Sequence, residues 1–182
     1  TWFDERLGGA KYTRKLLDKV FPDHWSFLFG EVALYSFVVL LLTGTWLSFF
    51  YEPSFQSVVY NGSFEKLQGV EMSAAYRSAI SLSFDVRAGL VMRQIHHWAA
   101  LIFVAAIVVH MARIFFTGAF RKPREINWVV GVTMLLLGMV NGFAGYSLLD
   151  DQLSAVGLRI ANSMILSIPV GGTWLSSLVR RR

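Results

Sequence analysis

The stretch from Arg93 to Arg113 constrains this chain more than any other, because it is apolar and uncharged between these two ends and yet contains three histidines. At 1.5 Å per residue, a helix of this length crosses the hydrocarbon layer of a bilayer. An unsatisfied imidazole in that layer costs several kcal/mol, so the histidines need an explanation. His96 and His110 are 14 residues apart, which on a helix gives a rise of about 21 Å and places both side chains on one face. His97 points to another face, and we expect a hydrogen-bonding or packing role for it.

The composition indicates one membrane bundle rather than several soluble domains. The chain has 182 residues, of which 54% are hydrophobic and 15% aromatic. It contains no cysteine, which excludes disulfides, iron–sulfur clusters and covalently attached c-type haem within these residues. The net charge of +5 comes from basic residues that flank the apolar runs. This arrangement favours a lipid membrane over nucleic acid as the partner.

Uncharged runs predict an all-α membrane protein with three transmembrane helices. We expect these spans at residues 30–51, 93–117 and 126–149. Residues 1–25 are basic and amphipathic and predict an interfacial helix. Between the first two spans, residues 72–82 predict a short surface helix after a turn at Asn61-Gly62. Residues 150–179 are moderately apolar, and we expect one or two helices there that lie on the membrane surface.

The distribution of cations predicts the orientation of the spans. Five basic residues precede the first span, and four lie at the end of the second span and in the short loop after it: Arg113, Arg121, Lys122 and Arg124. Short basic loops favour the cytoplasm, so we expect a multi-pass protein of the cell membrane with a cytoplasmic N-terminus. The arginines at positions 180–182 favour the opposite orientation.

The 14-residue spacing of the two histidines recurs in the glycines of the other two spans. Gly30 and Gly44 lie near the ends of the first span, and Gly131 and Gly145 lie near the ends of the third. Two imidazoles about 21 Å apart cannot share one metal ion. Each can instead ligate the iron of a separate haem, and glycine, which has no Cβ, lets a flat macrocycle approach a helix closely. Because the spacing repeats in three spans, it favours two stacked haems.

Each of these features also has an ordinary explanation. A single intramembrane histidine usually hydrogen-bonds to a neighbouring helix, and Gly138-x-x-x-Gly142 resembles a helix-packing motif. Arg93 and Arg113 each lie three residues from a histidine, where an arginine can extend to the interface, pair with a haem propionate, or do both. His24 precedes the first span, and we expect it to be interfacial rather than a ligand.

Several segments are distinctive enough to carry a family resemblance: Arg-Gln-Ile-His-His-Trp-Ala-Ala at 93–100, the basic run at 110–125 and Gly-Tyr-Ser-Leu at 145–148. They resemble the N-terminal part of cytochrome b, the subunit of quinol–cytochrome c reductases whose photosynthetic relative is cytochrome b6. Residues 31–37 and 84–98 are most similar to the actinobacterial, menaquinol-oxidising branch.

The resemblance implies a cytochrome b-type four-helix haem bundle that holds two haem b groups and carries electrons from quinol across the membrane. By position, His96 matches the iron ligand of the low-potential haem near the outer side, and His110 that of the high-potential haem near the inner side. The four glycines match positions against which the haems lie. Arg93 and Arg113 match positions that bind propionates, and the segment containing Gly157 matches helices beside the outer quinol-oxidation site.

The chain departs from the family pattern in three respects. The family takes a second histidine for each haem from a fourth span, which we expect from the rest of cytochrome b or from a separate chain. The outer-site Pro-Glu-Trp-Tyr motif is absent, and Leu149 replaces a family proline. We therefore expect a truncated product, a fragment or one piece of a split subunit, which belongs to an oxidoreductase complex and is not catalytic alone. The implied partners are the iron–sulfur protein and cytochrome c subunits, quinol and the lipid membrane.

Two alternative functions stay open on the sequence alone. One is a non-catalytic truncated membrane subunit that packs with partners and holds no haem. The other is a di-haem membrane cytochrome that anchors a dehydrogenase.

Overall fold

The computed structural model describes Arg14, Asp18 and residues 24–179. The interfacial helix expected over residues 1–25 therefore lies almost entirely outside the described residues. In the described part the chain is mainly helical, and it adds one short hairpin at one end of the bundle. The elements in chain order are η1 (Trp25–Phe27), α3 (Leu28–Ser48), β1 (Ser57–Val59), η2 (Glu65–Leu67), β2 (Glu71–Ser73), α4 (Ala74–Phe84), α5 (Gly89–Phe116), α6 (Glu125–Ser147), α7 (Gln152–Leu166) and α8 (Gly172–Val179).

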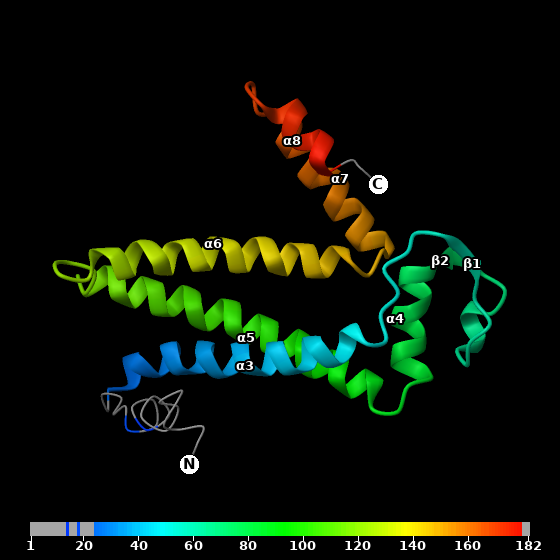
Figure 1. The fold of residues 1–182 in the computed structure, drawn as a ribbon, viewed down its shortest axis with the longest axis horizontal. Helices are drawn as coiled ribbons and strands as arrows, with labels where there is room; N and C mark the ends of the chain where they lie inside the picture. Colours follow the sequence, from blue (N-terminus) through cyan, green and yellow to red (C-terminus); the bar gives the residue numbers. More distant parts are fainter. Residues whose placement is uncertain (1–13, 15–17, 19–23, 180–182) are drawn as a thin grey trace, which may run out of the picture.

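Three helices, α3, α5 and α6, are long and apolar enough to cross a membrane. Figure 1 shows α5 between the other two, with α3 crossing it on one side, and with α6 close to it at the loop that joins them and diverging from it toward α4. Few of their residues are buried within the chain, and of α6 only Ser147 is. Since the exposed surface of these helices is largely apolar, lipid or further protein must cover it. The three predicted spans are therefore confirmed as a multi-pass arrangement.

Small side chains bring α3 and α5 close together. Ala33 and Thr43 of α3 are buried, as are Ala99 and Ala106 of α5. Small residues let two membrane helices approach with their backbones, which compensates for the lack of a hydrophobic driving force in lipid. This close approach sets the register in which α3 faces the histidines of α5.

The turn from α4 into α5 depends on one glycine. A Cβ on Gly89 would lie 1.7 Å from the carbonyl oxygen of Leu82, so no other residue fits there without movement. Arg93, which was expected to mark the start of the span, lies one turn inside α5. Its Nη1 donates hydrogen bonds to the carbonyl oxygen of Ala79, at 3.2 Å, and to the hydroxyl of Ser83. Because α4 accepts hydrogen bonds from this charged side chain, α5 can begin at Gly89, four residues before the predicted start of the span.

A short antiparallel hairpin, β1 with β2, lies beside α4 at one end of the bundle (Figure 1). Tyr60 follows β1 and is fully buried, and its hydroxyl accepts a hydrogen bond from the backbone N–H of Phe64 at 3.2 Å. Ser73 caps α4 by accepting from the N–H of Tyr76. The surface helix expected at residues 72–82 is α4, shifted by two residues because residues 71–73 pair as a strand.

Helices α7 and α8 form a hairpin that projects from the end of α6 nearest α4 (Figure 1). Asp151 caps α7 by accepting a 2.7 Å hydrogen bond from the N–H of Ser154. The hydroxyl of Ser176 bonds to Oδ1 of Asn162 at 2.8 Å and links the two helices. One or two helices were expected over residues 150–179, and the structure has two. Their position on the membrane surface stays a prediction.

Candidate functional site

His96 lies against the C-terminal part of α3. A Cβ built on Gly44 would come within 3.2 Å of its Cε1, which is closer than most real Cβ contacts. The ring nitrogen Nδ1 is 2.9 Å from the hydroxyl of Thr43. The imidazole is partly buried. The absence of a side chain at Gly44 therefore makes room for the ring of His96.

His110 repeats this arrangement at the other end of the same two helices. A Cβ on Gly30 would lie 2.8 Å from Cε1 and 3.0 Å from Nδ1 of the ring, so any side chain there would displace it. Within the described part of the chain, the buried Nδ1 of His110 has no hydrogen-bond partner. Two histidines of α5 thus face two glycines of α3, and both pairs are separated by 14 residues.

The glycines of α6 have different surroundings. A Cβ on Gly131 would meet the sulfur of Met111 at 3.1 Å, and one on Gly138 would meet Phe103 at 3.5 Å. Among the described residues nothing lies within 4 Å of a Cβ on Gly142 or Gly145. The surface of α6 is therefore in contact with α5 near Gly131 and open near Gly145, in agreement with the divergence of α5 and α6 in Figure 1.

Each arginine beside a histidine is anchored to a different element. Among the described residues, Arg93 bonds to α4 through Nη1, and a guanidinium has five N–H donors in all. Arg113 stacks over the ring of Phe27, with Cζ 4.0 Å from the ring centroid, an arrangement that favours a cation. In the described residues its buried Nε lacks a hydrogen-bond acceptor. A carboxylate close to Arg113 would satisfy this donor.

The residues present fit haem b. Over the described ranges, no three His, Cys, Asp or Glu side chains gather to enclose a metal ion. Each histidine instead offers one imidazole beside an apolar helix surface, which is what an axial haem ligand requires. Three features agree with a large, flat, acidic cofactor. They are the glycines against which the imidazoles pack, the open surface near Gly145, and the Nε donor of Arg113 that lacks an acceptor among the described residues.

Comparison with known proteins identifies the group to which the chain belongs. A family model described as cytochrome b (N-terminal)/b6/petB matches residues 101–180. The cytochrome bc1 complex cytochrome b subunit of Corynebacterium diphtheriae is 57% identical over 176 residues, which are 97% of this chain and 33% of that protein. The subunit with the same name from Mycobacterium leprae is 61% identical over 173 residues, 94% of this chain and 31% of that protein. The chain belongs to the cytochrome b family.

The match lies in the N-terminal part of cytochrome b, and the chain spans about a third of the length of the curated relatives it matches. A solved structure described as a hyperthermophilic respiratory Complex III has the same fold, with a TM-score of 0.72 and 26% sequence identity. It is similar over 93% of this chain and 40% of its own. The sequence comparison and the structural comparison thus agree on the membrane fold of cytochrome b.

Two other histidines of this cytochrome b segment lie apart from the glycine pairs. His24 accepts a hydrogen bond from the N–H of Ser26 through Nδ1 and caps η1. His97 is exposed and packs edge-on against the neighbouring Trp98. Neither His24 nor His97 supplies one of the atoms that lie nearest to a Cβ built on a glycine of α3 or α6.

Thr43 is a site residue that the sequence reasoning missed. Its hydroxyl contacts His96 directly, yet threonine in an apolar run draws no attention by composition. The available signal was its position, because Thr43 immediately precedes Gly44 in the 14-residue repeat. When α3 and α5 pack so that Gly44 lies against His96, the neighbouring Thr43 also reaches the imidazole ring of His96.

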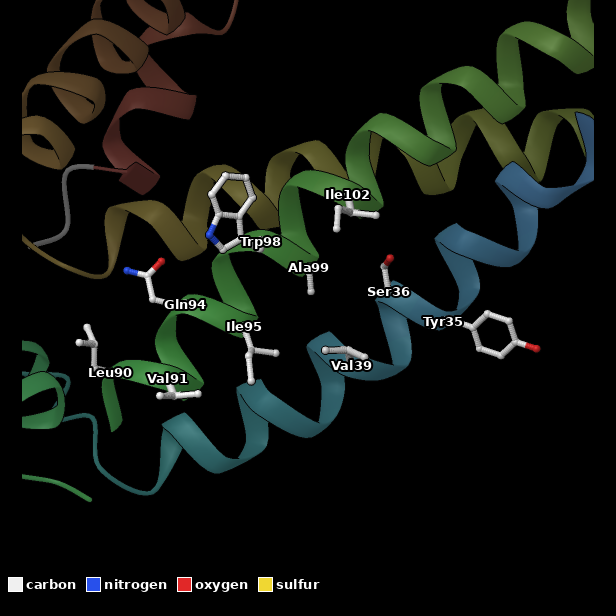
Figure 2. Close-up of a pocket in the computed structure, with 10 residues that line it drawn as sticks. All are labelled: Tyr35, Ser36, Val39, Leu90, Val91, Gln94, Ile95, Trp98, Ala99 and Ile102. Carbon is white, nitrogen blue, oxygen red and sulfur yellow. The ribbon is translucent and has the colours of Figure 1, made fainter. Parts of the chain in front are cut away.

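A separate groove of about 630 Å³ lies between α3 and α5, and its lining is almost entirely apolar. Figure 2 shows Val39, Ile95 and Ile102 among its lining residues. Ile95 precedes His96 by one residue, which turns a helix by about 100°. The groove therefore opens on a different face of α5 from the histidines, and neither His96 nor His110 lines it.

Proposed function

We propose that this chain is the haem-bearing N-terminal part of the cytochrome b subunit of a quinol–cytochrome c reductase. His96 would ligate an outer haem b and His110 an inner haem b. The observation that carries the proposal is the repeated pairing of an α5 imidazole with an α3 glycine, once at Gly44 and once at Gly30. A rise of about 21 Å between the two histidines places the pairs near opposite boundaries of the hydrocarbon layer.

The bound haem would supply reversible one-electron exchange between ferric and ferrous iron. The chain itself contributes position and exclusion of water. Both histidines project from one rigid helix, so the two sites keep a fixed separation. The exposed surfaces of α3 and α5 are largely apolar, which would exclude water from the two sites and keep the local dielectric constant low. Electrons would then move between the two sites along the axis of α5.

Further residues of the chain would complete each site from two directions. Gly131 and Gly145 of α6 would face the macrocycles from the side opposite α3, and the open surface at Gly145 supports this role. Arg93 and Arg113 would pair with propionates at the outer and inner boundaries. The unpaired Nε of Arg113 supports the inner contact, and the remaining N–H donors of Arg93 support the outer one.

The remaining components would come from outside these residues. A second imidazole for each haem would come from a fourth span, in the rest of cytochrome b or on a separate chain. The partners would be the iron–sulfur protein and cytochrome c subunits, with quinol as the reductant. We also propose a cytoplasmic N-terminus, which makes the α5–α6 loop cytoplasmic and places α4, the hairpin and α7 on the outer side.

The test is a reduced-minus-oxidised spectrum and a haem assay of the purified complex that contains this chain. The proposal predicts two haem b per chain, six-coordinate in spectrum and reducible by quinol. A complex that assembles with no b-type haem would instead favour a structural membrane subunit. Two b haems in a complex with a dehydrogenase, and without an iron–sulfur protein, would favour a dehydrogenase anchor.

A further inference from the structure

The hydroxyl of Thr43 fixes the protonation pattern of His96. Thr43 is buried, and its hydroxyl donates to the carbonyl oxygen of Val39 one turn earlier, at 2.7 Å. The same oxygen is 2.9 Å from Nδ1 of His96. A hydroxyl has a single proton, so toward His96 the oxygen acts as the acceptor. The neutral imidazole is therefore protonated on Nδ1, which leaves the lone pair of Nε2 for a metal.

The inner histidine lacks such a partner. The residue before Gly44 on α3 is Thr43, but the residue before Gly30 is Phe29, whose side chain has no polar atom. Over the described residues, Nδ1 of His110 is buried and forms no hydrogen bond. Both rings lie against a glycine of α3. The two sites thus share their geometry and differ in the hydrogen bond at Nδ1.

We propose that Thr43 is a positioning residue that orients His96 and lowers the reduction potential of the outer haem relative to the inner one. This inference rests on the proposed function, since both histidines must be haem ligands. A hydrogen bond from Nδ1–H makes an imidazole more basic. A more basic axial ligand stabilises ferric over ferrous iron, and hydrogen bonding around a ligand is one of the means by which a protein sets haem potential. The direction agrees with the order of potentials that the family resemblance implies.

The test compares three variants in the assembled complex. Thr43→Val replaces the hydroxyl by a methyl group of similar size, and Thr43→Ser keeps the hydroxyl. Thr45→Val is the matched control, because the Thr45 hydroxyl makes the same backbone bond, to Leu41 at 2.7 Å, from an exposed position on the same helix. In the described residues Thr45 has no hydrogen bond to a histidine, so its replacement removes the helix bond alone.

The potentials of the two haems are measured by redox titration, and the axial ligation of the ferric haems by electron paramagnetic resonance. Thr43→Val should lower the preference of the outer haem for the ferric state about tenfold, which raises its one-electron potential by about 59 mV. It should also shift the outer low-spin ferric signal and weaken outer-haem retention by roughly 10- to 100-fold. Thr43→Ser and Thr45→Val should keep both potentials at the wild-type values.

An unchanged outer potential in Thr43→Val would overturn the inference, as would an equal shift in Thr43→Ser or Thr45→Val. Loss of the outer haem from Thr43→Val supports the role of the hydroxyl if Thr43→Ser retains a wild-type potential. Loss from both Thr43 variants overturns it. The complete absence of b-type haem from the wild-type complex would refute the proposed function instead, so the two failures are distinguishable.

Discussion

Replacing Gly30 by alanine should weaken the inner haem site far more than the same change at Gly44 weakens the outer one. Ordinary contacts to a Cβ begin at 3.4 Å. A Cβ at Gly30 would lie 2.8 Å from the His110 ring, about 0.6 Å closer than an ordinary contact. A Cβ at Gly44 would lie 3.2 Å from the His96 ring, about 0.2 Å closer than an ordinary contact. A free ring can rotate away from the methyl group. An iron bond at Nε2 removes that freedom, so the clash acts on the haem-bound state.

The magnitude follows from the cost of overpacking, which is about 1–3 kcal/mol for an added methyl group in a tight site. Gly30→Ala should cost about 2 kcal/mol of haem binding, or roughly 30-fold in affinity, and Gly44→Ala less than about 1 kcal/mol. The helix itself should gain slightly, since alanine favours a helix by about 0.5–1 kcal/mol over glycine. The loss is therefore specific to the cofactor.

The assay is the rate and extent of haem transfer from the purified complex to excess apomyoglobin, followed by the b-type absorption band. Gly142→Ala is the matched control, because in the described structure its Cβ would meet no heavy atom within 4 Å. It should release haem at the wild-type rate. Equal haem loss from Gly30→Ala and Gly142→Ala, or greater loss from Gly44→Ala than from Gly30→Ala, would refute the reasoning.

Three further predictions concern the glycines of α6, the hydrogen bond between Ser63 and Asp85, and the cap of α7. Gly131→Leu and Gly145→Leu should each exclude one haem while the helix still inserts, as measured by haem content together with co-purification of partner subunits. Ser63→Ala should raise the pKa of Asp85 toward its ordinary value of 3.8, because the Ser63 hydroxyl is the main cause of the lowered pKa, as a carboxyl NMR titration would show. Asp151→Ala should destabilise the start of α7 by about 1 kcal/mol, measured by hydrogen exchange.

The sign of the Asp85 effect follows from linkage. Its pKa is lowered in the folded chain, so its stabilisation is fully present above pH 3.8 and is lost as the pH falls through the lower folded value. Ser63→Ala should lack this stabilisation at neutral pH, and an unchanged Asp85 titration in this variant would contradict the prediction.

For the Gly131 and Gly145 variants, unaltered haem content with weakened subunit association would indicate that these glycines serve helix packing instead. For Asp151→Ala, wild-type exchange of the first turn of α7 would refute the capping role.

Sequence reasoning predicted the three spans because each is an uncharged run that only a membrane helix accommodates. It also predicted that His96 and His110 share a face, because the helical repeat fixes their phase once the helix is accepted. The ends of the spans were less accurate. Arg93 was taken as a boundary, yet it lies within α5 because carbonyl and hydroxyl groups of α4 bind it. That bond depends on tertiary structure and leaves no local pattern.

The hairpin and the contacts of the glycines also required the structure. Each strand of the hairpin has three residues, which is too short for an alternating pattern to emerge. Gly30 and Gly44 were expected to admit a macrocycle, and the structure shows that each also admits an imidazole. Which helix surface faces which ring depends on the crossing of α3 and α5, and that crossing is set by small residues spread over both helices. A role for these glycines against haem stays a prediction.

The most direct test of the account is a potentiometric titration of the b-type absorption in the assembled complex, with His96→Ala, His110→Ala and His97→Ala compared with the wild type. The wild type should show two one-electron components. His96→Ala should lose the component with the lower potential, His110→Ala the one with the higher potential, and His97→Ala neither. Retention of both components in the His96 or His110 variant, or equal loss in His97→Ala, would contradict the assignment of one haem to each of the two histidines.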